Sequence, residues 1–359
     1  MPAHPSLKRI TEERAALTRE EARELMQQVL TGQLSDVELA ALLGAIAGRG
    51  ESAVELAGFV DAMRAAATPV PLDEAERSQL VDTCGTGGDA SGTFNISTAA
   101  ALVAAAAGAT GASIMVAKHG NRAVTSACGS ADVLESLGIP VALSPERAAA
   151  ALRSHRFAFL HAPTLHPAMK AVMPVRRAIG VRTVFNVLGP LTNPAGARAQ
   201  VMGVYSAHLV PIVAEAMRLL GVRHAFVVHG FVDASRTAGM DELSISGPSQ
   251  VAEIRRDAVA FFDLTPEQVG LRTAPIDRLR GGDAAANAQI LRDIFAGEPG
   301  PHRDVVLLNA AAVLVTAGLV PAAIADRHDA LRAGIELAAH AIDAGAVTTL
   351  IAALGGSSS

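Results

Sequence analysis

The chain has 359 residues, of which 50% are hydrophobic and 18% are charged, and its net charge is −5. This composition supplies a sizeable core and excludes an intrinsically disordered chain. Nucleic-acid-binding surfaces are usually basic and often aromatic, whereas this chain is acidic and only 3% aromatic.

The two cysteines and the apolar runs bear on where the protein works. Cys84 and Cys128 form no CxxC or Cys/His motif of the kind that binds structural zinc, so we expect two reduced thiols. The longest weakly polar run, AALVAAAAGA, is too short to span a membrane. We therefore expect a soluble cytoplasmic protein that binds neither nucleic acid nor a membrane.

Three capping boxes of the S/T-x-x-E type mark the starts of three helices in the first seventy residues. Apolar residues follow each box at helical spacing, and two prolines, Pro69 and Pro71, end the segment. The pattern predicts a small helical unit at the N-terminus. The boxes are Thr18 with Glu21, Ser35 with Glu38, and Ser52 with Glu55.

Short apolar runs alternate with helical patterns in the remainder of the chain. This alternation predicts an α/β domain with a largely parallel central sheet. Ser144-Pro145 and Thr265-Pro266 each place a cap residue before a first-turn proline and so predict helix starts. Residues 304–319 are expected to form a buried helix, and residues 331–354 a single amphipathic helix. The expected strands are 80–81, 114–117, 157–160, 184–187, 200–204 and 225–228.

A glycine-rich stretch, VDTCGTGGDASGTFNIST, spans residues 81–98. Its glycines allow consecutive backbone N–H groups to surround an anion. Asn95 to Thr98 begin the next helix, whose N-terminus also attracts anions. The stretch matches neither G-x-G-x-x-G nor Walker A, so it indicates neither a dinucleotide site nor an NTPase. It predicts a phosphate site, with a tight turn before a capped helix as the alternative.

Three further motifs carry polar groups suited to phosphate, metal and carboxylate. Lys118-His119-Gly120-Asn121-Arg122 directly follows a predicted strand, where parallel sheets bind ligands. Asp241-Glu242 is an adjacent carboxylate pair of the kind that holds Mg²⁺ beside substrate phosphates. Arg176 follows two prolines and would suit a substrate carboxylate. Taken alone, each motif is weak evidence, and an acidic pair such as Asp241-Glu242 is more often an ordinary pair on a surface loop.

In this order, the motifs resemble those of the anthranilate phosphoribosyltransferase family over nearly the whole chain. The resemblance implies a transfer of the phosphoribosyl group from phosphoribosyl diphosphate to the amine of anthranilate, in tryptophan biosynthesis. It implies a helical domain (1–75, completed by 164–185) hinged to an α/β domain (76–163 and 186–359) of the nucleoside phosphorylase/phosphoribosyltransferase type, in a homodimer. It is carried by CGTGGDASGTFNIST, VAKHGNRAVTSACGSADVLESLG, APTLHPAMKAVMPVRRAIGVRTVFNVLGPLTNP and GMDELS.

The resemblance also assigns site residues, motif by motif. Anthranilate would face Gly85, Asn121 and Arg176, with His119 close by. Mg²⁺, as two ions, would be held by Ser97, Asp241 and Glu242. No single catalytic residue is implied, because catalysis would rest on positioning and electrostatics. Phosphoribosyl diphosphate would be bound by Gly85, Gly88, Asp89, Thr93, Asn95, Ile96, Ser97, Thr98, Lys118, His119, Gly120, Asn121, Arg122, Ala123, Val124, Thr125, Ser126 and Ser130.

Two segments of the chain depart from the family's pattern, and two alternative functions stay open. Residues 108–117 and 231–238 are longer than the family's usual segments, and the second lies just before the predicted metal pair. One alternative is a pyrimidine nucleoside phosphorylase, which the acidic pair and the Asn95–Thr98 motif argue against. The other is a nucleic-acid-binding relative without transferase activity, which the net charge of −5 argues against.

Overall fold

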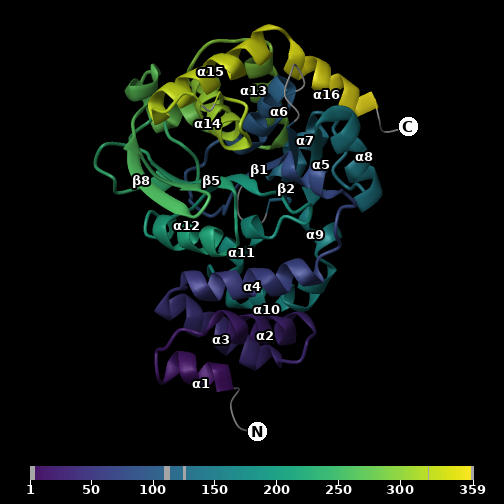
Figure 1. The fold of residues 1–359 in the computed structure, drawn as a ribbon, viewed down its shortest axis with the longest axis vertical. Helices are drawn as coiled ribbons and strands as arrows, with labels where there is room; N and C mark the ends of the chain where they lie inside the picture. Colours follow the sequence, from purple (N-terminus) through teal and green to yellow (C-terminus); the bar gives the residue numbers. More distant parts are fainter. Residues whose placement is uncertain (1–4, 109–113, 124–126, 322, 357–359) are drawn as a thin grey trace.

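The computed structural model describes residues 5–108, 114–123, 127–321 and 323–356, which form a helical part and a larger α/β part (Figure 1). The helical part lies at one end of the molecule and contains the N-terminal helices. The predicted fold class is confirmed. The N-terminal helices are α1 (Pro5–Thr11), α2 (Arg19–Leu30), α3 (Asp36–Arg49) and α4 (Ala53–Ala66).

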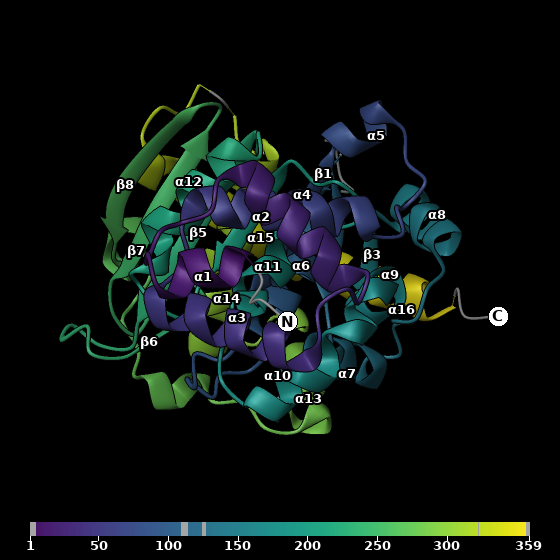
Figure 2. The ribbon, with the colours of Figure 1, turned by 90° about the horizontal axis from the view of Figure 1, so that it is seen from below.

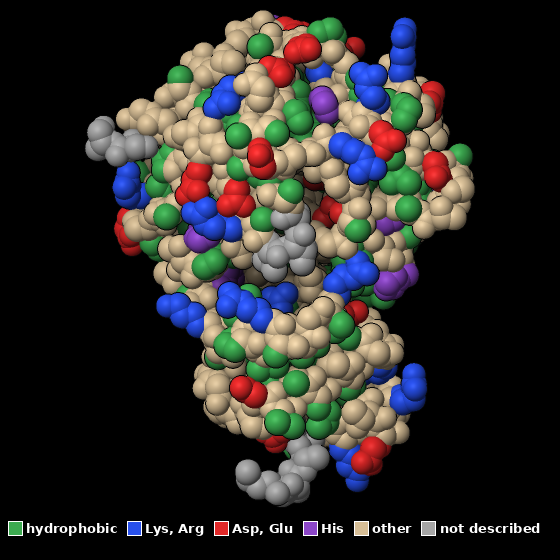
Figure 3. All heavy atoms as spheres, turned by 180° about the vertical axis from the view of Figure 1, so that it is seen from behind, with side chains coloured by type: hydrophobic (Ala, Val, Ile, Leu, Met, Phe, Trp, Pro, Cys, Tyr) green, Lys and Arg blue, Asp and Glu red, His purple; other side chains and the backbone are tan. Residues whose placement is uncertain are grey.

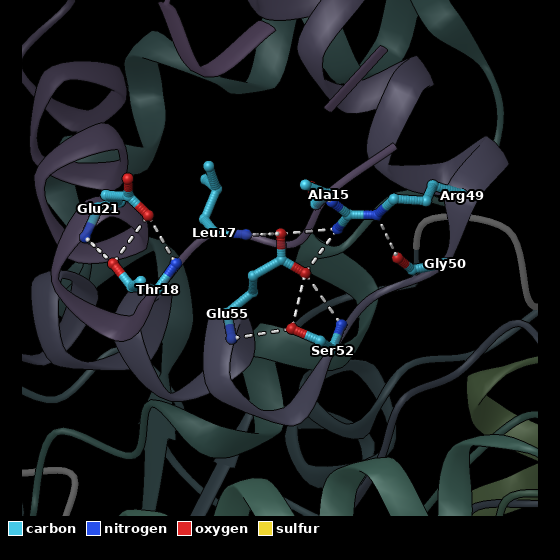
Figure 4. Close-up of polar contacts among 8 residues, drawn as sticks. All are labelled: Ala15, Leu17, Thr18, Glu21, Arg49, Gly50, Ser52 and Glu55. Atoms are coloured by element: carbon cyan, nitrogen blue, oxygen red, sulfur yellow. Dashed lines mark hydrogen bonds and ion pairs between the residues drawn. The ribbon is translucent and has the colours of Figure 1, made fainter. Parts of the chain in front are cut away.

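All three predicted capping boxes are present at the starts of α2, α3 and α4. The third box is also the centre of a buried network (Figure 4). The Glu55 carboxylate is fully buried and accepts hydrogen bonds from Arg49 Nη2 at 2.5 and 2.6 Å and from Leu17 N at 3.0 Å. Arg49 also donates to Ala15 O at 2.6 Å. The network therefore joins the end of α3 and the start of α4 to the segment before α2.

A later segment of the chain packs on these helices. Contacts join η1 to α2, α10 to α3 and α11 to α4, and Figure 2 shows α10 close to α3. The division of the chain at 75, 163 and 185 stays a prediction. The segment consists of α9 (Ala162–Leu165), the 3-10 helix η1 (Pro167–Ala171), α10 (Met173–Ile179) and α11 (Phe185–Leu191).

In the described part of the chain, eight strands form one sheet in the order β3-β2-β1-β4-β5-β7-β8, with β6 beside β5. The strands from β3 to β5 run parallel, and β6, β7 and β8 are antiparallel additions on one side. The strands are β1 (Leu80–Gly85), β2 (Met115–Gly120), β3 (Phe157–His161), β4 (Ala199–Gly203), β5 (His224–Phe231), β6 (Gly239–Met240), β7 (Ser249–Arg255) and β8 (Ala258–Leu264).

Helices cover both faces of the sheet. Helices α6 (Ile96–Gly108) and α14 (Pro301–Ala317) lie on one face and α12 (Leu209–Leu219) on the other. The small side chains of α6 allow close packing, and Ser97 is its one residue outside the core. Since α4 packs on α12, the core of the helical part continues onto the sheet. The other helices are α5 (Glu74–Ser78), α7 (Ser130–Ser136), α8 (Pro145–His155), η2 (Pro266–Val269), η3 (Ile276–Leu279), α13 (Ala284–Phe295), α15 (Arg327–Asp343) and α16 (Ala346–Gly356).

The strand predicted at 184–187 is wrong, because these residues enter helix α11. Buried side chains at Val184, Val187, Leu188 and Leu191 follow the helical period of three and four residues. The N–H of Thr183 donates to the side-chain oxygen of Asn186 at 3.1 Å, which supports the helix start. A window of four apolar residues is too short to separate this period from that of a strand.

The C-terminal prediction also needs correction. The tail forms two helices, because Gly345 adopts φ +70° between α15 and α16. The proline turn at Thr265-Pro266 starts only one 3-10 turn, which Gly270 ends. Among the described residues, no single helix has the length and apolar character of a membrane span. Helices α15 and α16 have that length and apolar character only when they are counted as one segment, and a bend of 61° separates them.

Candidate functional site

The glycine-rich loop follows β1 at the carboxyl edge of the parallel sheet. Gly87, Gly88 and Gly92 adopt φ of +68°, +76° and +69°, and Ala90 also has a positive φ of +61°. These left-handed conformations turn successive N–H groups to one side, as an anion-binding nest requires. The loop then enters α6, whose first turn contains Ser97.

The acidic pair Asp241-Glu242 lies directly against this loop. Asp241 Oδ2 accepts a hydrogen bond from Gly87 N at 2.6 Å, and Asp241 N donates to Asp89 Oδ2 at 3.2 Å. Glu242 Oε1 accepts from Ser97 N, at the start of α6, at 3.0 Å. The structure therefore brings the predicted phosphate loop and the predicted metal pair into one site.

Two glycines make this approach possible. A Cβ on Gly85, at the end of β1, would lie 2.1 Å from Asp241 Oδ2. A Cβ on Gly203, at the end of β4, would lie 1.5 Å from the Asp241 carbonyl oxygen. Any side chain at either position would push Asp241 away, so these glycines serve close approach rather than an unusual φ.

The longer segment at 231–238 does not displace the acidic pair. It folds back on itself, with Val232 N donating to Ala238 O at 3.0 Å. Strand β6 then pairs with the end of β5, so the chain re-enters the sheet just before Asp241. Of the other longer segment, 109–113 lie outside the described residues, and 115–117 belong to β2.

Burial and like charge make the acidic pair suited to a cation. Burial, followed by the charges of Asp89 and Glu242, raises the pKa of Asp241 well above its usual value. Burial also raises the pKa of Glu242 to about 7, although Lys118 acts in the opposite direction. Among the described residues no three His, Cys, Asp or Glu side chains form a group that could hold a metal ion by itself. Two adjacent carboxylates beside a phosphate loop suit Mg²⁺, which takes few protein carboxylates together with phosphate oxygens and waters.

Lys118 places a buried ammonium group behind the site. Its side chain is 1% exposed, and Nζ donates to Thr83 O at 2.7 Å and to Ser97 Oγ at 3.3 Å. The neighbouring Asp82 is fully buried and accepts from His119 N at 3.1 Å. Burial raises the pKa of Asp82 to about 6, although the Asn193 side chain and then Lys118 favour its charged form. These contacts fix the backbone where β2 ends.

His119 is held as a neutral ring. Its Nδ1 lies 3.1 Å from Gly189 O, and its ring centroid lies 5.1 Å from that of His166. Burial and then the nearby His166 lower the pKa of His119 to about 3. Nε2 of both rings is buried without a hydrogen-bond partner among the described residues. Each ring therefore keeps one polar atom for a ligand.

Arg122 and Ala123, which follow β2, contact the acidic side chains of α7. Arg122 forms ion pairs with Asp132 at 3.1 Å and with Glu135 at 2.7 Å. Asp132 also accepts from the N–H groups of Ala123 and Gly129. The Arg122 charge is thus engaged by α7, which begins at Ser130. Val124, Thr125 and Ser126 lie outside the described residues. The Asn121 side chain accepts from Arg122 N, and Gly120 packs against Phe159.

Arg176 is a half-buried guanidinium whose surroundings are apolar. It lies 5.3 Å from the centroid of the Phe185 ring and 3.9 Å from Met173 Sδ. Burial lowers its pKa. Among the described residues it has no carboxylate partner, which leaves its donors for an acidic ligand. Figure 3 shows Lys and Arg side chains gathered around a hollow at the boundary between the helical and α/β parts.

The remaining predicted site residues contact other segments of the chain or lie buried in α6. Thr93 is joined to Arg280 by an isolated bridge, and Asn95 donates to Cys128 O at 3.3 Å. Ile96 and Thr98 are fully buried in α6. Asn95 also accepts from Asn287 at 2.9 Å.

Several residues with a place in the site were missed by the sequence analysis. Gly203 acts through close packing against Asp241, whereas Asn287 donates a hydrogen bond to Asn95 and Asp82 accepts one from His119 N. Arg182 contacts the glycine-rich loop from a distant segment. The sequence marks these residues only by their position near a motif or at a strand end. Such a position does not predict which residue a side chain will contact in the fold.

Two family models match this chain. The helical bundle domain of a glycosyl transferase family matches residues 5–67, and the a/b domain of that family matches residues 77–348. Together they cover the N-terminal helices and most of the α/β part, including the site described above.

Curated relatives and solved structures agree with these models. The chain is 48% identical to the anthranilate phosphoribosyltransferase of Brevibacillus brevis over 331 residues, which are 92% of this chain and 91% of the relative. It is 47% identical to that of Solibacter usitatus over 350 residues, 98% and 97% of the two chains. The structure of the Thermus thermophilus enzyme superposes with a TM-score of 0.86 at 42% identity, covering 98% and 99% of the chains. That of the Saccharomyces cerevisiae enzyme in complex with PRPP and Mg gives 0.83 at 26% identity, covering 98% and 97%.

Proposed function

This chain belongs to the glycosyl transferase family of these models, among its anthranilate phosphoribosyltransferases, and we propose that it transfers a phosphoribosyl group to anthranilate. The reaction consumes 5-phosphoribosyl 1-diphosphate, forms N-(5-phosphoribosyl)anthranilate, releases diphosphate and serves tryptophan biosynthesis. The observation that carries the proposal is the meeting of the glycine-rich loop, the start of α6 and the acidic pair at one sheet edge.

Phosphoribosyl diphosphate is proposed to lie along this edge. The left-handed turns at Gly87 and Gly88 and the positive end of α6 supply donors for its phosphates. Lys118 adds a buried positive charge next to Ser97. The ribose and the sugar phosphate would then extend toward the loop after β2. The proposed contacts are Gly85, Gly88, Asp89, Thr93, Asn95–Thr98, Lys118–Ser126 and Ser130.

Magnesium is proposed at Ser97, Asp241 and Glu242, and this set is supported by the contact of Glu242 with Ser97 and by the contacts of Asp241 with Gly87 and Asp89. The yeast relative was solved in complex with PRPP and Mg. We propose two ions, as the resemblance of the motifs to the family implies. When bound, Mg²⁺ would neutralise charge on the departing diphosphate.

Anthranilate is proposed to bind beside Gly85, Asn121 and Arg176, with the neutral ring of His119 close by. Arg176 would form a charge-assisted fork with the substrate carboxylate, since its guanidinium has no carboxylate partner among the described residues. The amine of anthranilate is weakly basic and neutral at pH 7, so attack requires no strong base. The chain's contribution is to align the amine with the ribose carbon and to stabilise negative charge on diphosphate.

A homodimer through the helical part is also proposed. One face of α3 exposes the apolar or small residues Val37, Ala41, Gly44 and Gly48, spaced as one helical stripe. Val37 is 79% exposed, more than any other large hydrophobic residue in the described part of the chain. A cytoplasmic location is proposed because the two cysteines, Cys84 and Cys128, form no motif of a disulfide framework or of a structural zinc site.

The proposed function is tested by anthranilate fluorescence. Emission should fall only when protein, phosphoribosyl diphosphate and Mg²⁺ are all present, and omitting any one should abolish the change. Replacing phosphoribosyl diphosphate with inorganic phosphate and a pyrimidine nucleoside tests the phosphorylase alternative. An arm with duplex and single-stranded DNA at physiological salt tests the nucleic-acid alternative. Stable anthranilate emission in the complete mixture would contradict the proposal.

A further inference from the structure

Arg182 joins the glycine-rich loop to a distant part of the chain. Its Nη1 donates to the carbonyl oxygen of Gly88 at 2.7 Å. The same guanidinium lies over the ring of Tyr205, with Cζ 4.5 Å from the ring centroid. Tyr205 follows β4, so one side chain contacts the loops after two neighbouring strands. A planar guanidinium suits both contacts at once, because it donates in its plane and stacks on its face.

Backbone hydrogen bonds complete the arrangement. The N–H of Tyr205 donates to Thr86 Oγ1 at 3.0 Å, and the N–H of Thr86 donates to Gly203 O at 3.0 Å. The glycine-rich loop is therefore held at Thr86 by the chain after β4 and at Gly88 by Arg182. A displacement of the loop must change the position of the guanidinium relative to Tyr205.

The segment that carries Arg182 also carries Arg176. Helix α10 contains Arg176 and ends at Ile179, and Gly180 follows it at φ +67°. Helix α10 packs on α3 in the helical part, and Tyr205 packs against the hydrophobic cluster that includes the core of that part. Its phenol pKa is raised by burial and then by the charge of Glu51, between α3 and α4. The Arg182 contacts thus lie between the proposed diphosphate site and the proposed anthranilate site.

We propose that Arg182 is a positioning residue that couples the two substrate sites, an inference that rests on the proposed function of those sites. Phosphates bound to the glycine-rich loop fix the Gly88 carbonyl, and Arg182 then fixes the segment that carries Arg176. Each ligand should therefore raise the affinity for the other by the same factor, because coupling free energies are reciprocal.

Tyrosine emission tests the first step of this coupling. Tyr205 is the one tyrosine of the chain, which has no tryptophan, so intrinsic emission reports on the surroundings of this ring. Titration with diphosphate and Mg²⁺ should give a saturable emission change in the wild-type protein. Arg182→Met keeps an apolar stem but removes the guanidinium, and it should abolish the change while calorimetry still detects binding. Arg182→Lys should give an intermediate response, because a lysine can donate to Gly88 but cannot stack as a plane.

Calorimetry tests the second step without turnover, because diphosphate is a product and does not react with anthranilate. Saturating diphosphate and Mg²⁺ should tighten anthranilate binding about 5-fold or more in the wild type and leave it unchanged in Arg182→Met. The matched control is Arg198→Met, which removes an exposed arginine at the opposite end of β4 that pairs with Glu74. This variant should keep the wild-type factor.

Two outcomes would overturn the proposal. One is an Arg182→Met protein with the wild-type emission response, and the other is the same protein with the wild-type coupling factor. A loss of thermal stability alone would show that Arg182 is only structural. The wild-type transferase assay separates this test from that of the function. If the wild type binds both ligands with coupling but does not turn over, the proposed reaction fails and the coupling stands.

Discussion

Arg176 and Gly88 owe their proposed roles to local surroundings rather than to residue type alone. Arg176 is half-buried against Phe185 and Met173 and has no carboxylate partner among the described residues. Gly88 adopts φ +76°, where a β-branched residue is strained. Each observation leads to a substitution with a specific expected result.

Replacing Arg176 with alanine should weaken anthranilate binding selectively. A charge-assisted hydrogen-bonded pair contributes about 1.5–3 kcal/mol, so the KM for anthranilate should rise about 10- to 150-fold. The KM for phosphoribosyl diphosphate should change little. Steady-state kinetics with each substrate varied in turn make the measurement, and Arg177→Ala is the neighbouring control with an exposed side chain. Equal increases in both KM values would show that Arg176 is structural.

Replacing Gly88 with valine should abolish phosphoribosyl diphosphate binding while circular dichroism still shows a folded protein. The branched side chain strains a left-handed turn and moves the N–H groups that face the proposed phosphate. Gly138→Val is the control, since Gly138 has φ +81° and no atom within 4 Å of its added Cβ. Calorimetry compares the two variants. Wild-type affinity in Gly88→Val would remove this turn from the phosphate site.

His119 should make the ligand-free protein less stable as the pH falls. Its pKa is about 3 when folded and 6.5 when unfolded, so the unfolded chain binds more protons between these values. The contribution of His119 to the free energy of unfolding is complete above pH 6.5, and about 2 kcal/mol of it is lost at pH 5. His119→Asn should therefore show a smaller loss of unfolding free energy between pH 7 and pH 5, measured with urea.

Asp82 contributes a pH dependence of the unfolding free energy that is opposite in sign to that of His119. This contribution is the same in the wild type and in His119→Asn. The folded Asp82 pKa of about 6 exceeds the unfolded value of 3.8, so its contribution decreases stability as pH rises from about 4 to 6. Identical pH dependence in the wild type and His119→Asn would mean that His119 is not held neutral by the fold.

At the scale of elements, the site forms because β1, β4, α6 and the chain after β6 meet at one edge. Asp241 and Glu242 reach Gly87 and Ser97 across more than 140 positions of sequence. Glycines at the ends of β1 and β4 leave room for the acidic pair.

Removing both charges of the acidic pair should raise the Mg²⁺ requirement. Asp241→Asn with Glu242→Gln keeps shape but loses the carboxylates, so half-maximal rate should need much more Mg²⁺ and kcat should fall. Without ligands and after chelation, the melting temperature should be equal or slightly higher, since buried like charges are gone. The control is Asp263→Asn with Glu267→Gln, in the edge strand β8 and in η2, which follows it. An unchanged Mg²⁺ titration would place the metal elsewhere.

Local signals predicted much of the fold. The capping boxes at Thr18, Ser35 and Ser52 specify helix starts through contacts three residues apart, and all three are confirmed. The apolar runs that became β1 to β5 were also recognised, apart from exact ends. The strand predicted at 184–187 was wrong because its helical period is visible only when residues to Leu191 are included.

Other features depend on contacts between distant segments. The sequence analysis did not predict the hairpin of β7 and β8. Buried and exposed residues alternate only weakly in β8, because all but the last residue of this strand are exposed or half-buried. The site motifs were identified by resemblance, but their hydrogen bonds were not. The Asp241–Gly87 and Arg182–Gly88 contacts need the folded sheet and the helical part, so no local pattern indicates them.

At the scale of the whole molecule, the helical part packs on one side of the α/β part and still exposes apolar residues on α3 (Figures 1 and 2). A homodimer would cover this stripe. It would leave the proposed substrate sites at the boundary between the two parts of each subunit.

Replacing Val37 with glutamate should convert the proposed dimer to a monomer. A charge at a residue that is 79% exposed costs the isolated subunit little, but it would be buried in the interface. Light scattering during size-exclusion chromatography gives the mass, which should halve. The control is Phe261→Glu, at another exposed apolar residue on β8, which should remain dimeric. A wild-type protein of monomer mass would contradict the dimer itself.

The proposed site transfers a phosphoribosyl group to anthranilate with loss of diphosphate. Anthranilate consumption and diphosphate release are followed in the same reaction, with the product identified by mass spectrometry. We expect one diphosphate released for each anthranilate consumed, and a product with the mass of N-(5-phosphoribosyl)anthranilate. Diphosphate release without anthranilate consumption, or no release at all with both substrates and Mg²⁺ present, would contradict the proposal.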